Sequence, residues 1–179
     1  MSGASGDFEL TGDELRAVAR YAATSAGDVL GVFEQERPDD GRPRAALESA
    51  RAFVDGAPRS RWQRTAAMDA HRAAAAAPTE ASRLAAQAAG DAAAAAYLHP
   101  IAKAHQVGHV LRAAANAVRI AEIRAGADLG AVERSLAQAR DRATPVVVDV
   151  LRRYPPAPAG RSRVARLMTE LDVSLRAGR

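Results

Sequence analysis

Cysteine is missing from this 179-residue chain, and aromatic side chains make up only 4% of it. Without a thiol, the chain has no disulfide, no thiolate metal site and no cysteine nucleophile. Lys103 is the one lysine, so arginine carries nearly all of the positive charge. No apolar run approaches the roughly 18 residues of a membrane-spanning helix, and the acidic, polar start of the chain is unlike a signal peptide. These absences predict a soluble, cytoplasmic protein with no membrane partner.

The net charge of +4 raises the question of a nucleic-acid partner. Surfaces that bind nucleic acid gather basic and aromatic residues on one face. Here the arginines are scattered among acids, and the densest basic group, residues 161–179, is diluted by Glu170 and Asp172. The pattern therefore does not favour nucleic-acid binding.

Alanine supplies much of the 48% of residues that are hydrophobic, whereas strand-forming residues are scarce. This composition predicts an all-α fold, either an antiparallel helical bundle or a short α-solenoid of about six to seven helices. A buried CH₂ contributes only about 0.8 kcal/mol, so a core of small side chains must rely on helices that approach each other closely.

Capping residues and prolines predict the helix ends. Thr11 and Glu14 form a capping box, Ser60 and Thr79 are N-cap residues of later helices, and Asp39 or Asp40 is expected to cap the helix between them. The predicted helices are 12–36, 43–55, 61–77, 80–98, 100–125, 128–153 with a break at Thr144 and Pro145, and 163–175.

These elements divide the chain into four parts. Residues 1–10 are a disordered N-terminal lead, residues 11–153 a helical bundle domain, residues 154–160 a Pro-rich linker and residues 161–179 a C-terminal helix. The last helix has an apolar stripe that packs either on the bundle or on a partner. A second copy of the chain, bound through this helix as a homodimer, is therefore one of the expected partners.

The predicted helix 100–125 carries a line of polar side chains that solubility does not require. They recur at steps of four, three, four and three residues, which at about 100° per residue places them on one stripe. The members are His105, His109, Arg112, Asn116 and Arg119. The opposite side of the helix is apolar, so the polar stripe is a candidate binding surface.

His105 and His109 have the i, i+4 spacing that allows two imidazoles to reach one metal ion. A site also needs a third ligand, and this stripe offers no carboxylate, while Arg112 stands beside the pair. The sequence therefore predicts neither a metal nor another cofactor.

A turn over residues 38–44 packs Asp39, Asp40, Arg42 and Arg44 together. Such residues can simply cap a helix and form exposed ion pairs, each contributing at most about 1 kcal/mol. The functional alternative is a charged cluster on the rim of a pocket. The sequence leaves both open, and we call this segment the acid–arginine turn.

The remaining candidates are isolated residues. His71 lies in the middle of a predicted helix, where a half-buried packing role is typical, and His99 lies where it can cap a helix end. Trp62, the single tryptophan, is a core or interface anchor. No Gly-rich phosphate loop, HExxH, GxSxG or paired catalytic carboxylate is present, so no catalytic residue is predicted.

Three passages resemble a family of bacterial immunity proteins of polymorphic toxin systems. The first, residues 33–48, contains the acid–acid–x–Arg–Pro–Arg motif; the second, residues 66–77, contains His71; and the third, residues 96–111, begins AYLHPIAK. The resemblance covers residues 10–126. It implies a small all-helical protein that binds and neutralises a toxin. It also gives weight to one polar cluster of Asp39, Asp40, Arg42, Arg44, His99 and His109.

Two functions follow as hypotheses. The first is a non-enzymatic binding protein that occludes a toxin through the acid–arginine turn and the polar stripe. The alternative is a small-molecule-binding protein or enzyme in which the same His, Asp and Arg side chains converge inside the bundle. As placed on these residues, both functions require the turn and the stripe to be neighbours in space.

Overall fold

The computed structural model describes residues 7–178, and every regular element among them is helical. The all-α prediction is confirmed. The described part has eight α-helices because the break at Thr144 and Pro145 separates two of them. The elements are α1 (Gly12–Glu36), α2 (Arg42–Val54), α3 (Arg61–Ala75), α4 (Glu80–Ala94), η1 (Ala95–Tyr97), η2 (Ala104–Gln106), α5 (Val107–Ala125), α6 (Leu129–Arg142), α7 (Pro145–Arg152) and α8 (Arg163–Ala177).

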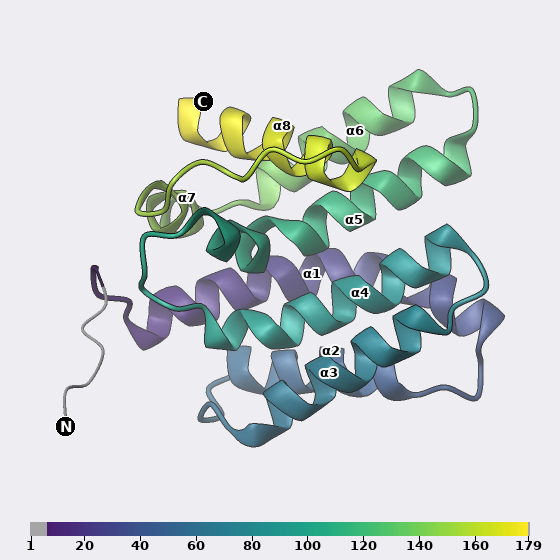
Figure 1. Cartoon of the computed structure of the whole chain (residues 1–179), viewed down its shortest axis with the longest axis horizontal. Coiled ribbons are helices and arrows are strands. Elements are labelled where there is room, and N and C mark those ends of the chain that lie inside the picture. Colours follow the sequence, from purple (N-terminus) through teal and green to yellow (C-terminus); the bar gives the residue numbers. More distant parts are fainter. Residues whose placement is uncertain (1–6, 179) are drawn as a thin grey trace.

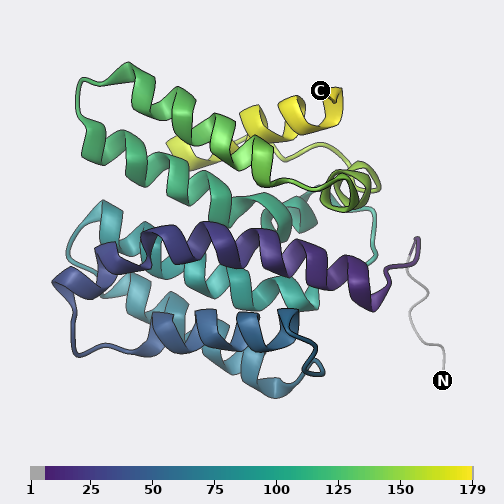
Figure 2. The same cartoon turned by 180° about the vertical axis from the view of Figure 1, so that it is seen from behind.

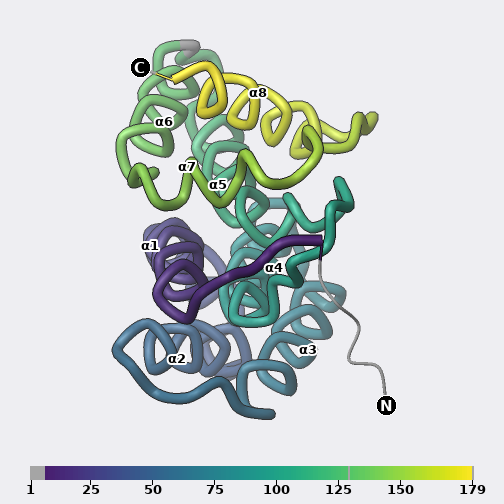
Figure 3. The backbone as a smooth tube through the Cα atoms, turned by 90° about the vertical axis from the view of Figure 1, so that its left-hand side faces the viewer, coloured from purple at the N-terminus to yellow at the C-terminus, as the bar shows by residue number. Residues whose placement is uncertain are grey.

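The helices are stacked as antiparallel pairs (Figures 1 and 2). In the end-on view of Figure 3, α2 and α3 form one layer and α1 and α4 form the next. Helix α5 begins the third layer, which α6, α7 and α8 complete. Helices α1 and α4 therefore lie at the centre and contact the layers on both sides. Within residues 7–178, no helix is both long and apolar enough to cross a membrane.

Most of the predicted caps are present. Thr11 and Ser60 form capping boxes with Glu14 and Gln63, and Thr79 accepts a hydrogen bond from the backbone of Ser82. The cap of α2 was predicted wrongly, because Gly41 occupies the N-cap position without a side-chain hydrogen bond. Asp40 instead accepts a hydrogen bond from the backbone N–H of Arg42, at 3.2 Å.

The start of α5 differs from the predicted helix 100–125. The chain is irregular after Leu98, and α5 begins only at Val107. The reason is competition for backbone groups. The carbonyl of Pro100 accepts from the N–H of Asp7, the Asp7 carboxylate accepts from the N–H of Ala102, and the N–H of His99 donates to the Gln106 side chain. These hydrogen bonds replace the backbone hydrogen bonds that a helix would form here. His105 therefore lies in η2 rather than on the stripe of α5.

Small side chains fill the contact between α3 and α4. The buried alanines of α3 are Ala66, Ala67, Ala70, Ala73 and Ala74, and those of α4 are Ala85, Ala86, Ala88, Ala89, Ala92 and Ala93. Gly90 lies among them, and a Cβ placed there would come within 3.1 Å of the Ala67 carbonyl oxygen. The two helices are thus as close as their backbones allow, which is how an alanine core gains dispersion contacts.

The ends of the described chain pack on the stack. Phe8 contacts the ring of Tyr154 edge-on at 5.0 Å, while residues 1–6 of the predicted lead lie outside the described residues. The apolar stripe of α8 is buried within the same chain, on Leu167, Leu171 and Leu175. That stripe therefore packs on the bundle, and a homodimer through α8 has no support from it.

Replacement of Ala70 by Leu tests the close approach of α3. Ala70 is fully buried, so the added methylenes must displace neighbouring backbone, and we expect a loss of about 1–3 kcal/mol in the free energy of unfolding. Ala75→Leu at the exposed end of the same helix is the matched control and should change stability by less than about 0.5 kcal/mol. Urea denaturation measures both; equal effects would show that the packing is loose.

Candidate functional site

A hollow of about 290 Å³ lies where α3, η1 and the beginning of α5 meet. We call it the histidine hollow, because three of the chain's four histidines line it. Its principal lining side chains are Arg64, Met68 and His71 from α3, Tyr97 from η1, His99 from the following loop and His109 from α5. Residues about forty positions apart thus share one concave surface, which combines apolar and titratable groups.

Asp91 of α4 lies behind this hollow and is only 2% exposed. Its Oδ1 is 3.8 Å from Nε2 of His71 and 3.3 Å from Nη1 of Arg112. Its Oδ2 has no hydrogen-bond partner among the described residues. Burial raises the pKa of Asp91 to about 7, although the charge of Arg112 and its hydrogen bond oppose the shift. Near neutral pH this carboxyl is therefore divided between its neutral and ionised forms.

Two histidines of the hollow, His71 and His109, are kept neutral. Burial, assisted by the charge of Arg112, lowers the pKa of His71. The same two causes, followed by the other three histidines, lower the pKa of His109 to about 4. Nδ1 of His109 is buried without a hydrogen-bond partner in the described structure. At pH 7 these imidazoles can accept or donate hydrogen bonds without carrying charge.

Gly90 is what allows His71 to reach Asp91. A Cβ at this position would lie 2.9 Å from Nε2 of His71, closer than real Cβ atoms approach other heavy atoms. Any larger residue would therefore move the imidazole or separate the helices. The neighbouring small residues of α4 thus position the site as well as the core.

The polar stripe of α5 is divided between different surroundings. His109 faces the histidine hollow, Arg112 pairs with Asp91, and Asn116 is fully buried. Arg119 pairs with Glu80 of α4 and Glu122 of its own helix. The other predicted member, His105, is exposed, and its Nε2 lies 2.9 Å from the Gln106 amide nitrogen. Residues 7–178 contain no group of three His, Cys, Asp or Glu side chains placed to hold a metal ion.

The acid–arginine turn lies elsewhere. Asp40 pairs with Arg42, Arg44 pairs with Glu34 of α1, and Asp39 lines a small hollow at the end of α1. Among the described residues, no hydrogen bond, ion pair or hollow joins the turn to the histidines. Figure 1 shows the α1–α2 connection at the opposite end of the stack from the start of α5. The expectation of one joint surface is therefore corrected: the two groups form separate surfaces.

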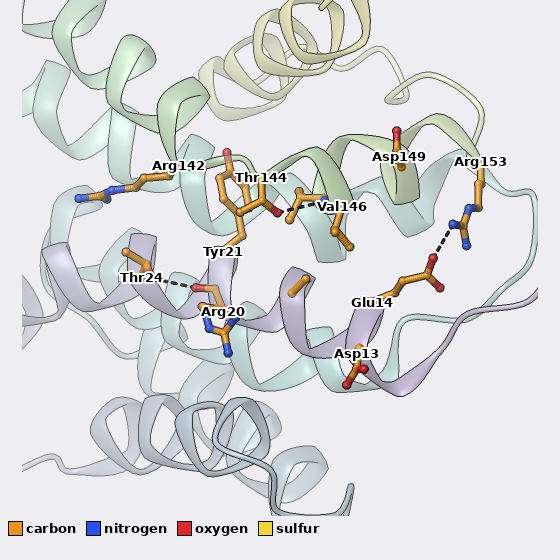
Figure 4. Close-up of a pocket in the computed structure, with 12 residues that line it drawn as sticks. Asp13, Glu14, Arg20, Tyr21, Thr24, Arg142, Thr144, Val146, Asp149 and Arg153 are labelled. Carbon is orange, nitrogen blue, oxygen red and sulfur yellow. Dashed lines mark hydrogen bonds and ion pairs between the residues drawn. The ribbon is translucent and has the colours of Figure 1, made fainter.

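A larger groove, of about 580 Å³, runs between α1 and α7, and no sequence motif predicted it. Figure 4 shows Glu14 of α1 and Arg153 at the end of α7 pointing toward each other across it. The hydrogen bond from Arg153 is the largest of the causes that lower the pKa of Glu14 to about 2. Segments far apart in the chain create this groove, so no local pattern could reveal it.

Comparison with protein families identifies the class of the chain. The model of the family described as "Imm-5 like putative immunity protein" matches residues 9–144. The match spans more than half of the chain, which therefore belongs to this family. It continues beyond the expected end at residue 126, includes α1 to α6 and stops before α7. No curated protein and no solved structure matches the chain.

Asp91→Asn tests the protonation of the buried carboxyl. The pKa of Asp91 is raised on folding from 3.8 to about 7, so its stabilising contribution is complete below about pH 3.8 and is lost as the pH rises through 7. Asn does not titrate. We therefore expect the variant to exceed wild type in unfolding free energy by about 1–3 kcal/mol at pH 8, and the difference to shrink toward pH 4.

His109 changes stability in the opposite direction. Because its pKa is lowered on folding from 6.5 to about 4, its stabilising contribution is lost as the pH falls through about 4. Both proteins retain His109, so their difference isolates Asp91. Urea denaturation at stepped pH measures it, with Asp69→Asn on the surface of α3 as the control. A difference that does not change between pH 4 and 8 would contradict the raised pKa.

Proposed function

We propose that this chain is a non-enzymatic binding protein that neutralises a cognate toxin by protein–protein contact. The observation that carries the proposal is membership of an immunity protein family over residues 9–144. The described residues supply a suitable surface on α3, which lies at one edge of the stack (Figure 3).

Two large apolar side chains are exposed on α3. Trp62 is 48% and Met68 is 51% exposed, whereas the other large hydrophobic residues exposed in the described structure, Val146 and Val173, lie on α7 and α8. Tryptophan and methionine are enriched at protein interfaces, and tryptophan is among the commonest binding hot spots. Exposure of Trp62 excludes the core alternative, and the proposal therefore assigns it the role of interface anchor.

The charge of the same surface favours an acidic partner. Arg59 and Arg64 both lie over the ring of Tyr97, at 5.2 and 4.7 Å from its centroid. These contacts hold two guanidiniums at the edge of the histidine hollow. Arg61 adds another exposed cation at the start of the helix. Complementary acidic residues on the toxin would steer its approach and fix its orientation.

Alanine substitution of Trp62 or Met68 tests this surface. Each variant removes an exposed anchor without opening the core, so folding should be preserved. We expect Trp62→Ala to weaken binding to a toxin encoded beside this gene by at least about tenfold, as for a hot-spot residue. Calorimetry gives the Kd, and survival of a strain that expresses the toxin gives the effect in cells.

Val173→Ala is the matched control, because it truncates an exposed apolar side chain on α8. It should bind as tightly as wild type. Arg42→Gln asks whether the contact reaches the acid–arginine turn, and we expect less than a twofold change, since Arg42 is paired with Asp40. Equal affinities for all variants would exclude the α3 surface, and failure of the wild type to rescue would refute neutralisation.

A further inference from the structure

A second hollow lies on the other side of Arg112, between α4, α5 and the segment that leads into α8. Its volume is about 460 Å³. Arg83 and Gln87 of α4, Arg112 and Asn116 of α5, and Ser162 and Arg163 at the start of α8 are among its lining residues. We call it the amide hollow, after Asn116.

Asn116 is the group in this hollow that the fold does not explain. The residue is 0% exposed, and neither its Oδ1 nor its Nδ2 has a hydrogen-bond partner among the described residues. Buried polar side chains in proteins nearly always have a partner, because an unmade hydrogen bond is costly. The side chain lines the hollow, so a bound group there could satisfy its amide.

The charges around Asn116 define the kind of group that fits. Arg163 donates to Glu122, and Arg112 lies 3.3 Å from Asp91, so both have acidic partners. Arg83 donates to the neutral side chain of Gln87, at 3.4 Å, and its charge also acts on Glu80. Glu80 also lines the hollow, but it accepts two hydrogen bonds from Arg119. The lining therefore has an excess of positive charge.

The start of α8 adds a further attraction for an anion. Ser162 is its N-cap, and its hydroxyl accepts a hydrogen bond from the backbone N–H of Ala165. The N-terminus of a helix of this length carries partial positive charge and backbone N–H groups that favour anions. Arginine, amide and helix terminus thus converge on one space from three elements.

We propose that the amide hollow binds a small oxyanion ligand, one that bears a phosphate or carboxylate group. Arg83 supplies the charge, Arg112 adds guanidinium N–H donors, and the Nδ2 of Asn116 donates to an oxygen of the ligand. The guanidinium groups recognise either oxyanion by paired N–H donors.

This site is separate from the proposed toxin surface, and it combines residues of the family core with residues beyond it. Residues 158–168 of its lining lie outside the matched residues 9–144, so the C-terminal segment completes the hollow. Toxin neutralisation and anion binding can therefore succeed or fail independently.

The experiment measures binding of two probes, inorganic phosphate and succinate, to the full chain by calorimetry and by thermal unfolding. Sodium chloride at matched ionic strength is the reference. We expect saturable binding of at least one probe and a rise in Tm that follows its concentration, since a ligand that binds the folded state stabilises it. The probe that binds more tightly identifies the oxyanion class.

Asn116→Leu and Arg83→Gln are the test variants, and each should weaken binding by at least about tenfold. Leu removes the unsatisfied amide, so Asn116→Leu should unfold at the same or a higher temperature than wild type without a probe. That result separates lost binding from lost folding. If Asn116→Leu does not fold, Arg83→Gln alone decides, because Arg83 is only half-buried and its replacement should not prevent folding.

Arg166→Gln, an exposed arginine of α8 that does not line the hollow, is the control and should bind like wild type. Two outcomes overturn the proposal. One is that neither probe shows saturable binding beyond the effect of sodium chloride. The other is that both test variants bind with wild-type affinity.

Discussion

The close approach of α3 and α4 is the constraint on which the rest of the structure depends. Alanines on both helices and Gly90 between them bring the backbones together, and this contact places His71 beside Asp91. A core of large side chains would be stabilised by burial of more apolar area per residue but would hold the helices apart. Here, the alanine composition that weakens each contact also builds the histidine hollow. Stability and site geometry share one set of residues.

Asp91 links the contact between α3 and α4 to the next helix, α5. The carboxyl lies between His71 of α3 and Arg112 of α5, and Arg112 lines the amide hollow on its far side. One buried acid therefore contacts a lining residue of each hollow. Its charge state near neutral pH sets how strongly Arg112 is held, because the attraction exists only when the carboxylate is ionised.

Sequence reasoning predicted the helices well because their ends depend on local chemistry. The Thr11, Ser60 and Thr79 caps involve residues only three positions apart, and the break at Pro145 follows from a missing N–H. The start of α5 was missed because its backbone groups are taken by Asp7, which is distant in the chain. Asp91 had a local signal, as the one acid in an apolar run of α4, but its partners come from two other helices. Separation of the acid–arginine turn from the histidines likewise depends on the order in which helix pairs stack.

The C-terminal segment supplies one wall of the amide hollow, and the family core supplies the rest. Without residues 158–168, Asn116 and Arg112 would line an open face of α5 rather than a hollow. The segment is held by Arg176, which donates to Asp172 and to the carbonyl of Tyr154, and the Tyr154 hydroxyl donates to the carbonyl of His99. His99 in turn lines the histidine hollow. The segment outside the family match is therefore bonded, through Tyr154, to the loop that shapes the first hollow.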